Sequence, residues 1–600
     1  MIRENKLLLN CNEAIAWAAL KAGVDFFSHY PGSPVNLVEP ELKKLDKRFN
    51  TQIAFNDSLN EHIAALAAAG ASFCGARSLV VMKHVGLNIA ADPFNYIGYT
   101  GVQGGMVIIV GTDPGANSST GEEDVHWYAP QFNFPLLEPT SVEECFNYVA
   151  DSFDFSEKYN IPVMIFIPGR LAYNFSEIEV PLEFNKKEKN FYFKKDKDVY
   201  INVGARAVKN HKLLIEKIER ISEEATFSKR FFAGDAKLGI ITRGLTFSIA
   251  HEAISKLQLG NELELLNLNL VYPTENKILS DFIKNKKEIV FIEDQDGFCE
   301  NQVKMNFFNE LNCSIEGKSV FKKYGEITIE QIEHYLAEKF KITLEIPESL
   351  DLPLVPERLG TFCEGCPHTG SYFSIDAALK DLDGVIGGDI GCSSLPPFRA
   401  DWLMCMNAGI GISAGMAQVI KTQPIISTGG DGSFFHAGAL SLLSAVRNKI
   451  NLIHVVFDNR SIAMTGFQKS PTTDYFDHVK FLESLGVDRV IEVFAYNTKD
   501  FTAKLKEELD KSGVRVFWVS GTCVRIGNEY IESRKHRLYP EIDAAKCGSC
   551  SKCYTELACP AILNISTNND QELKIDLNAC VRCGICHEIC PNGAIKIHEI

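Results

Sequence analysis

Short apolar runs alternate with helix-like segments over the first 180 residues. Three runs are continuously apolar, as buried parallel strands are: SLVVMKH (78–84), GMVIIVGTD (105–113) and IPVMIFIPG (161–169). Two other segments have the apolar spacing of helices: NEAIAWAALKAG (12–23) and NEHIAALAAAGASFCG (60–75). This alternation predicts an α/β domain over residues 1–180.

The rest of the chain contains further regions of different character. Residues 181–234 include NKKEKNFYFKKDKDVY, which is charged and lacks a core period, so we expect a connector there. Residues 235–345 return to an α/β pattern, and IPESLDLPLVPERLG (346–360) is proline-rich and predicts a linker. A second large α/β unit is predicted over 361–535, with PIISTGGDG (424–432) and NLIHVVFDN (451–459) as strands around one helix.

Composition and charge narrow the class of protein. A chain of 600 residues with 46% hydrophobic residues can bury several cores. Its net charge of −16 argues against nucleic acid as the main partner. No apolar run approaches the ~20 residues that span a bilayer, and the first residues do not form a signal peptide. We therefore expect a cytoplasmic protein that does not bind membranes, whose 18 cysteines serve metal or redox chemistry.

Eight cysteines in the last 60 residues show a recognisable spacing, and we expect a domain over 540–600. Two runs end in Cys-Pro: Cys547, Cys550, Cys553 and Cys559, then Cys580, Cys583, Cys586 and Cys590. The second run has the spacing of two-cluster ferredoxins, in which the fourth cysteine ligates the other cluster. We therefore assign Cys547, Cys550, Cys553 and Cys590 to one [4Fe–4S] cluster, and Cys580, Cys583, Cys586 and Cys559 to a second. Zinc is the alternative, but two interleaved runs with Cys-Pro endings favour iron–sulfur clusters.

A glycine-rich turn carries an acid where a phosphate would be repelled. Gly430, Asp431 and Gly432 follow a predicted strand, and Asn459 ends the next one. Because parallel strands end at the same sheet edge, Asp431 and Asn459 are expected to be neighbouring oxygen donors suited to Mg²⁺. The metal would bridge to a diphosphate, which the helix N-terminus near Ser433 also favours. An ordinary turn is the alternative, but the spacing to Asn459 is that of a thiamine diphosphate motif.

Thiamine diphosphate also needs a carboxylate beside its aminopyrimidine ring. Glu61 begins an alanine-rich helix whose small side chains are unusual for a surface. The alternative for an acid at a helix start is a cap or a dipole partner.

Together these segments resemble the large subunit of indolepyruvate:ferredoxin oxidoreductases, within the thiamine-dependent 2-oxoacid:ferredoxin oxidoreductases. The resemblance covers nearly the whole chain and is carried by these motifs: NEAIAWAALKAGV, YPGSP (30–34), NEHIAALAAAGAS, MKHVGLNIAADP (82–93), CEGCPH (363–368), GDIGC (388–392), GGDGSFFHAG (429–438), FDNRSIAMTG (457–466) and the cysteine-rich tail. It implies an α/β fold with two thiamine-binding-type doubly wound domains, a transketolase C-terminal-like α/β domain at 235–345, and a two-cluster ferredoxin-like module.

The resemblance also implies roles for individual residues. Glu61 would activate the cofactor, and Ser33 would contact the substrate. The Mg²⁺ ligands would be Asp431, Asn459 and the backbone of Ser461. The further cofactor-binding residues would be Gly430, Gly432, Ser433 and Thr465.

The implied reaction is the oxidative decarboxylation of a 2-oxoacid, an arylpyruvate such as indolepyruvate. Electrons would leave singly through iron–sulfur clusters to ferredoxin, and coenzyme A would take the acyl group. A small second subunit with a gamma-type domain is expected as a partner, in an α₂β₂ assembly.

Three positions depart from the family pattern. His126 stands where most relatives have arginine, Phe467 replaces a histidine, and IPGR (167–170) replaces another motif. Neutral drift and a changed substrate both remain open. If His126 pairs with the substrate carboxylate, it would do so more weakly than arginine, and binding would weaken as pH rises through the His126 pKa. A bulky, aromatic 2-oxoacid is then expected.

Four cysteines outside the tail suggest a third cluster. Cys363, Cys366, Cys392 and Cys523 lie in loops of the predicted diphosphate-binding domain. Four unrelated thiols are the alternative. Related small catalytic subunits bind a [4Fe–4S] cluster beside thiamine with cysteines in this order, so the resemblance implies one here.

Two other classes of function deserve comparison. A non-oxidative thiamine-dependent 2-oxoacid decarboxylase would have no use for the ferredoxin cysteines. An electron-transfer scaffold would not need Asp431, Asn459 and Glu61 together.

Overall fold

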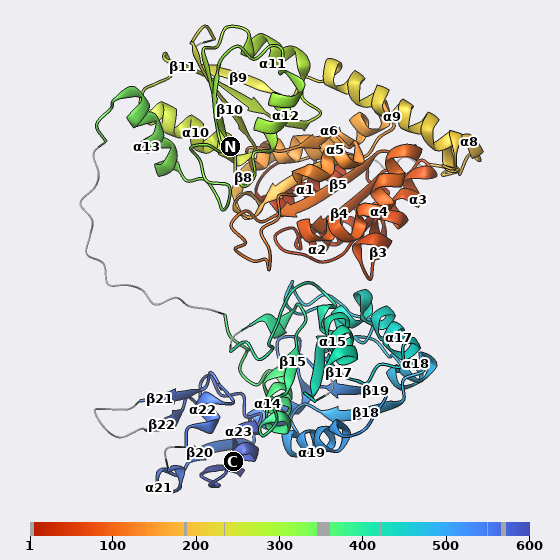
Figure 1. Ribbon diagram of the computed structural model, residues 1–600, viewed down its shortest axis with the longest axis vertical. Coiled ribbons are helices and arrows are strands. Elements are labelled where there is room, and N and C mark those ends of the chain that lie inside the picture. Colours follow the sequence, from red (N-terminus) through yellow and green to blue (C-terminus); the bar gives the residue numbers. More distant parts are fainter. Residues whose placement is uncertain are drawn as a thin grey trace. The chain divides into compact units, whose positions relative to one another are not determined.

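The computed structural model describes residues 5–184, 189–232, 234–344, 360–395, 397–420, 422–548, 550–565 and 572–599 (Figure 1). The chain divides into two compact units, Met1–Leu350 and Asp351–Ile600. Residues 346–359 of the predicted linker lie outside the described residues. The limits predicted for the smaller domains stay predictions.

The first unit is built on a seven-stranded sheet of order β12-β6-β7-β5-β4-β2-β3. Every pairing in it is parallel except that of β12 with β6. Its strands are β2 (Phe26–His29), β3 (Ala54–Asp57), β4 (Ser78–Lys83), β5 (Met106–Thr112), β6 (Leu136–Leu137), β7 (Val163–Pro168) and β12 (Leu270–Tyr272). All residues of β5 are buried, which explains its continuously apolar sequence.

Helices cover this sheet in two packed groups. One group is α1 (Cys11–Lys21), α2 (Val38–Phe49) and α6 (Val142–Tyr159). The other is α3 (Glu61–Phe73), α4 (His84–Thr100) and α5 (Tyr128–Phe132). Shorter elements are the antiparallel pair β1 (Lys6–Asn10) and β8 (Phe175–Glu179), with η1 (Val125–Trp127), α7 (Gly169–Ala172) and α8 (Lys197–Tyr200).

A second sheet of the same unit has the order β14-β13-β10-β11-β9. Its strands are β9 (Lys229–Phe232), β10 (Leu238–Arg243), β11 (Leu263–Leu268), β13 (Glu288–Ile292) and β14 (Ser314–Glu316), and its helices are α10 (Leu245–Lys256), α11 (Asn276–Ile283), α12 (Phe298–Asn306) and α13 (Ile329–Phe340).

One expectation differs from this part of the structure, and one apolar run divides in a way that its pattern alone does not show. The apolar run 263–273 is two strands, because β11 joins the second sheet and β12 joins the first. The segment 181–234, expected as a connector, contains the long helix α9 (Ala205–Glu224) and the strand β9. Helix α9 buries Leu214, Ile218 and Ile221 in the core of the first sheet, so its described part contributes to packing as well as to connection.

The second unit is built on a parallel five-stranded sheet of order β15-β16-β17-β19-β18. Its strands are β15 (Val385–Gly387), β16 (Ile425–Gly430), β17 (Leu452–Asp458), β18 (Arg489–Phe494) and β19 (Val514–Ser520). The other elements are α14 (Pro367–Leu379), η2 (Cys392–Ser394), α15 (Ala408–Val419), α16 (Asp431–Ser433), the π-helical turn η3 (Phe434–Gly438), α17 (Ala439–Arg447), α18 (His478–Ser484) and α19 (Thr498–Leu509).

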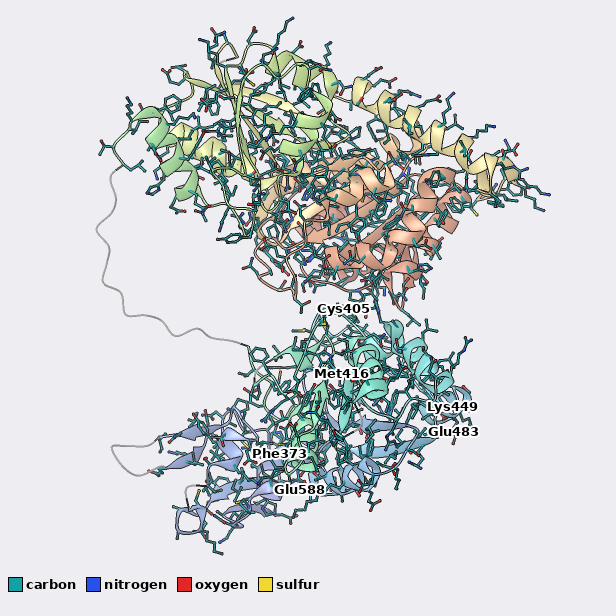
Figure 2. All side chains as sticks on the ribbon, in the orientation of Figure 1. Phe373, Cys405, Met416, Lys449, Glu483 and Glu588 are labelled. Atoms are coloured by element: carbon teal, nitrogen blue, oxygen red, sulfur yellow. The ribbon has the colours of Figure 1, made fainter. Side chains whose placement is uncertain are left out.

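A cysteine-rich tail packs on this sheet domain within the second unit. It contains two antiparallel pairs, β20 (Leu538–Ile542) with β23 (Ile595–Glu599) and β21 (Ile562–Asn564) with β22 (Leu573–Ile575), and the helices α20 (Glu529–Lys535), α21 (Ala544–Cys547), α22 (Lys552–Thr555) and α23 (Ile585–Ile589). Glu588 of α23 (Figure 2) accepts hydrogen bonds from the backbone N–H groups of Thr498 (3.2 Å) and Lys499 (3.0 Å). The tail thereby caps the N-terminus of α19.

Among the described helices, none combines the length and the apolar character that crossing a bilayer requires.

Candidate active site

Asp431 and Asn459 lie at the same edge of the second unit's sheet. Asp431 follows β16, Asn459 follows β17, and these strands are adjacent and parallel. Asp431 is 1% exposed. Its Oδ2 accepts hydrogen bonds from the hydroxyls of Ser470 (2.5 Å) and Thr472 (2.8 Å). The structure thus places at one sheet edge the two residues that were expected to bind a metal.

A second buried carboxylate accompanies Asp431. Asp458 Oδ1 accepts a hydrogen bond from the Thr472 hydroxyl at 2.7 Å, so this hydroxyl lies between the two acids. Burial, and then the charge of Asp458, raise the pKa of Asp431 to about 7. A cation here would stabilise the ionised form of Asp431. Buried carboxylates beside the amide oxygen of Asn459 are a donor set that fits Mg²⁺.

The turn after β16 has room for a ligand. A Cβ placed on Gly430 would meet no atom within 4 Å, whereas one on Gly432 would lie 3.1 Å from Ile462 Cγ1. Ser433 is buried, and its Oγ accepts a hydrogen bond from the Asn407 N–H at 3.1 Å. The helical run that begins at Asp431 contains the π-helical turn η3, a feature frequent at functional sites.

The loop after β17 is held by local hydrogen bonds. The Ser461 N–H donates to Asn459 Oδ1 (3.2 Å), and the Thr465 hydroxyl donates to Gln468 Oε1 (2.8 Å). The Ile462 N–H donates to the Gln468 carbonyl at 2.9 Å and closes the loop. Phe467 lies within it as an exposed residue at φ 63°. The loop therefore places Ser461 beside Asn459 and holds Thr465 against Gln468.

Four cysteines gather next to the carboxylate site. Cys363 and Cys366 precede α14, Cys392 begins η2, and Cys523 follows β19. Burial, and then the thiols of Cys392, Cys363 and Cys523, raise the pKa of Cys366. Burial, Cys523, Cys363 and then Asp431 raise the pKa of Cys392 to about 12. The Cys523 N–H also donates to the Asn459 carbonyl at 3.0 Å, so these thiols neighbour both one another and the candidate metal site.

The eight tail cysteines line two separate cavities. Cys547, Cys550, Cys553 and Cys590 share one, and Cys559, Cys580, Cys583 and Cys586 share the other. These are the two sets that the interleaved pairing predicts. Each cavity combines three cysteines of one run with the last cysteine of the other run, Cys590 or Cys559, which the fold brings beside them.

The second tail cavity borders the loop of Cys363 and Cys366. Glu364, Gly365 and Thr369 line it together with the tail cysteines. A Cβ on Gly365, at φ 71°, would lie 2.2 Å from Val581 Cγ2, so only glycine allows this approach. The four cysteines of the sheet domain therefore lie between the Asp431 site and the second cysteine cavity of the tail.

Glu61 lies at the carboxyl edge of the first unit's sheet. It is the first residue of α3, after the cap residue Asn60, whose side chain accepts a hydrogen bond from the Ile63 N–H at 2.9 Å. Glu61 is 5% exposed. A Cβ on Gly86 of α4 would lie 2.6 Å from its Cγ and 2.7 Å from its Oε1. The cap belongs to Asn60, and the Glu61 side chain rests against the first turn of α4.

Ser33 lies in the loop after β2 at the same sheet edge. Its hydroxyl hydrogen bonds with the phenol of Tyr173. A Cβ on the neighbouring Gly32 would lie 2.6 Å from Lys83 Cβ. The loop that carries Ser33 is therefore packed against the end of β4.

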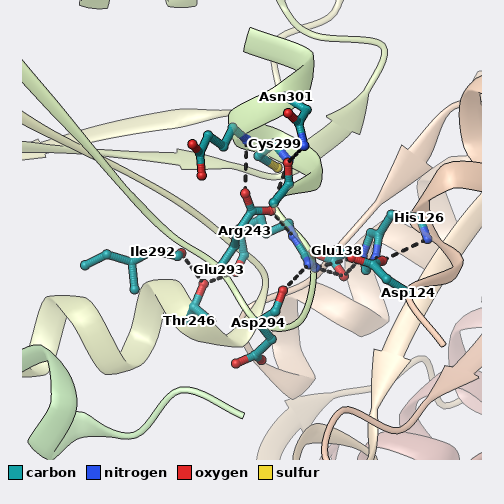
Figure 3. A network of polar contacts seen from close by, with 12 residues as sticks. Asp124, His126, Glu138, Arg243, Thr246, Ile292, Glu293, Asp294, Cys299 and Asn301 are labelled. Carbon is teal, nitrogen blue, oxygen red and sulfur yellow. Dashed lines mark hydrogen bonds and ion pairs between the residues drawn. The ribbon is translucent and has the colours of Figure 1, made fainter. Parts of the chain in front are cut away.

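His126 belongs to a buried network of charged side chains (Figure 3). Its Nδ1 contacts Asp124, and its Nε2 lies 2.7 Å from Glu138 Oε1 and 2.7 Å from Arg243 Nη1. Arg243 also contacts Glu293 Oε2 at 3.1 Å. His126 is 2% exposed, so its ring is sealed from solvent.

The electrostatics of His126 follow from these partners. Burial and the Arg243 guanidinium lower its pKa, but the carboxylates of Asp124 and Glu138 outweigh them and raise it to about 9. As an imidazolium, His126 donates to a carboxylate from each ring nitrogen. This geometry leaves no nitrogen for a substrate carboxylate. We therefore replace the predicted substrate contact by a structural role for His126 between the two sheets of the first unit.

Sequence reasoning missed several residues of these sites. Asp458 and Thr472 complete the carboxylate cluster, and Gly86 contacts Glu61. Asp389, in the quoted GDIGC motif, accepts hydrogen bonds from the N–H groups of Asn407 (2.6 Å) and Ile390 (2.8 Å). Asp458 directly precedes Asn459 and could have been found by its position. The others depend on contacts between distant segments.

Three segments of the chain match models of known protein families. Residues 17–224 match the family described as pyruvate flavodoxin/ferredoxin oxidoreductase, thiamine diP-bdg. Residues 389–519 match the thiamine pyrophosphate enzyme, C-terminal TPP binding domain, and residues 573–596 match the 4Fe-4S binding domain.

Similarity to individual proteins extends over nearly the whole chain. The indolepyruvate oxidoreductase subunit IorA of Archaeoglobus fulgidus is 31% identical, over 98% of this chain and 97% of the relative. That of Methanothermobacter thermautotrophicus is 32% identical, over 99% and 97%. Among solved structures, a 2-oxoglutarate:ferredoxin oxidoreductase from Magnetococcus marinus aligns with a TM-score of 0.47 and 17% identity, over 56% of this chain and 66% of that one.

Proposed function

Since this chain belongs to the family of IorA subunits of indolepyruvate oxidoreductases, we propose that it catalyses the oxidative decarboxylation of a 2-oxoacid. A 2-oxoacid, coenzyme A and two oxidised ferredoxins would give CO₂, an acyl-CoA, two reduced ferredoxins and a proton. We propose an arylpyruvate such as indolepyruvate as the substrate. The curated relatives of that name support this choice.

The main support within the structure is the series of sites in the second unit. At the sheet edge of Asp431 and Asn459, the Cys523 N–H donates a hydrogen bond of 3.0 Å to the Asn459 carbonyl. The Cys363 and Cys366 loop in turn borders a tail cavity lined by four cysteines. A site for a thiamine cofactor beside successive thiol groups suits a reaction that ends in single-electron transfer.

The chain's own residues would hold the cofactor as follows. When bound, thiamine diphosphate supplies the electron sink that decarboxylation requires. Asp431, Asn459 and the Ser461 backbone would bind Mg²⁺ on the diphosphate. Gly430, Gly432, Ser433 and Thr465 would line the cofactor site. Glu61 would hydrogen bond the aminopyrimidine ring, and its buried position beside Gly86 supports a fixed carboxylate.

We propose three [4Fe–4S] clusters in each chain. Two would occupy the tail cavities, and the third would use Cys363, Cys366, Cys392 and Cys523. The mutual influence of these four thiols and their contact with the Asn459 backbone support the third cluster. It would stand between the cofactor and the tail.

The assembly and location are also part of the proposal. The relatives are named as subunits, and we propose a small second subunit carrying the gamma-type domain, in an α₂β₂ enzyme with ferredoxin as acceptor. Cysteines used as cluster ligands rather than disulfides suit the reducing cytoplasm.

Anaerobic reduction of a viologen dye tests the function. The complete enzyme is supplied with several aryl and alkyl 2-oxoacids, with and without coenzyme A, and dye reduction is measured together with CO₂ release. We expect fastest reduction with arylpyruvates and coenzyme A. Release of CO₂ without dye reduction would instead indicate the non-oxidative decarboxylase.

A pair of variants tests the cofactor site. Asp431→Asn should abolish magnesium-dependent binding of thiamine diphosphate. Asp474→Asn changes an exposed acid in the nearby loop, paired only at 3.5 Å with Lys469, and should leave binding unchanged. Equal binding by both variants would contradict the site.

A further inference from the structure

The proposed reaction needs a positive partner for the carboxylate of its 2-oxoacid. A carboxylate taken out of water is costly unless it is paired with a charge. His126 was expected in this role, but both of its ring nitrogens face carboxylates in a closed network. Another cation at the sheet edge that carries Ser33 and Glu61 must therefore fill this role.

Lys83 occupies that edge between the two residues. It ends β4 and is the residue directly before α4. Its Cβ is the atom that a Cβ on Gly32 would meet at 2.6 Å, so the Ser33 loop packs on it. One turn further along α4, Gly86 contacts the Glu61 side chain. Lys83 is therefore flanked by the loop of the expected substrate contact and by the expected cofactor activator.

The ammonium group of Lys83 has capacity to bind an anion. It donates to the Ser118 carbonyl at 2.7 Å, which uses one of its three N–H groups. Its side chain is partly buried, and burial lowers its pKa against the opposing charge of Asp113. A partly desolvated ammonium gains more from a bound carboxylate than an exposed one does.

Arg170 is the main competitor at the same edge. It follows β7, but its guanidinium already contacts Glu326 Oε1 at 2.6 Å and Asp294 Oδ2 at 3.6 Å. Two carboxylates thus neutralise Arg170, whereas the ammonium group of Lys83 donates to a neutral carbonyl. The geometry favours Lys83.

We propose that Lys83 is the cation that binds the carboxylate of the 2-oxoacid, next to Ser33 and Glu61. This inference rests on the proposed function. It assigns substrate recognition to the end of β4 and leaves His126 its structural role. It also provides a cation for the 2-oxoacid without the arginine that the resemblance leads one to expect at residue 126.

Lys83→Gln tests this assignment in the complete enzyme. For phenylpyruvate, we expect the KM to rise about tenfold to a hundredfold while kcat changes much less, because a charge-assisted hydrogen bond in binding is lost. Calorimetric titration with phenylacetate and with phenylacetamide measures directly how much the carboxylate contributes to the binding affinity. The variant should lose affinity for the acid and keep its affinity for the amide, and Lys83→Arg should restore much of the acid affinity.

Lys43→Gln is the matched control. Lys43 lies at the same sheet edge, but its Nζ is held by Glu39 (2.5 Å) and Asp57 (3.1 Å). Lys43→Gln should therefore leave the affinities for phenylacetate and phenylacetamide unchanged. An unchanged KM in Lys83→Gln, or equal losses of acid and amide affinity, would overturn the proposal. If the wild-type enzyme reduces no dye with any 2-oxoacid, the proposed function fails instead, and the two titrations still report on Lys83.

Discussion

Glu61 is the single residue on which the proposed chemistry most depends. It is buried at the start of α3, and its cap neighbour Asn60 already serves the helix. We predict that Glu61→Gln lowers turnover by on the order of 10²-fold or more, because an amide cannot replace the carboxylate in proton transfer. Hydrogen–deuterium exchange at C2 of bound thiamine diphosphate should slow in parallel, with iron content unchanged. Turnover within a few-fold of wild type would assign activation to another group.

Gly86 should act through Glu61. A methyl group at residue 86 would overlap the Glu61 side chain, so we predict that Gly86→Ala lowers turnover by up to about 10²-fold through misplacement of the carboxylate. In a Glu61→Gln background the same substitution should cost little further activity, which a double-mutant cycle measures.

Gly70→Ala is the control for Gly86→Ala. Gly70 lies on the same helix as Glu61, and a Cβ there meets no atom within 4 Å. Alanine should keep activity and favour the helix slightly. Additive losses in the Gly86 and Glu61 double variant would show that Gly86 matters for another reason.

His126 makes the stability of the first unit depend on pH. Its pKa rises from the ordinary 6.5 to about 9 on folding, so its stabilisation is complete below pH 6.5 and is lost as pH rises through 9. The full effect is on the order of 3 kcal/mol. The protection factors of peptides from β6 and β10 in the whole chain, measured relative to the intrinsic exchange rate at each pH, should therefore fall between pH 6.5 and 9.

His126→Arg separates this role from substrate binding. An arginine stays charged over the whole range, so it should keep stability near neutral pH and remove the loss between pH 6.5 and 9. His126→Ala should destabilise the unit by about 3–5 kcal/mol, because it leaves buried carboxylates unpaired. A changed KM with unchanged stability would support the original assignment to substrate.

At the scale of elements, helix α23 joins the tail to α19. Glu588 accepts two of the N–H groups that the start of α19 cannot satisfy itself. We predict that Glu588→Ala weakens this docking by about 1 kcal/mol. Proteolysis and hydrogen exchange of the tail should increase, and electron transfer from substrate to ferredoxin should slow more than transfer to a small dye. Glu541→Ala, at an exposed position of β20, should change none of these.

At the scale of the whole molecule, three clusters predict about 12 iron atoms per chain, against about 8 for the tail alone, at four per cluster. Cys363→Ser should lower the count by about four and slow reduction of the tail clusters by substrate. Cys405→Ser (Figure 2) is the control, because Cys405 is exposed and outside the three cysteine sets. A reconstituted anaerobic sample with about eight iron atoms, unchanged in Cys363→Ser, would remove the third cluster from the proposal.

The sequence by itself determined the features that depend on neighbouring residues. The apolar runs 78–84, 105–113 and 161–169 predict β4, β5 and β7 respectively, because a strand buried on both faces must be apolar throughout. The cysteine spacing of the tail and the positions of Asp431 and Asn459 are likewise local, because each follows a strand or belongs to a short motif. The fold class and the family could therefore be predicted without coordinates.

Only the tertiary structure decided the contacts between distant segments. From the sequence, His126 is a plausible substrate contact, but in the structure Glu138 and Arg243 lie against its Nε2. The run 263–273 divides between two sheets because its halves find different partners. The approach of Gly86 to Glu61 and the position of Lys83 also follow from packing. Hydrophobic periodicity records whether a residue is buried, but not which distant side chain lies against it.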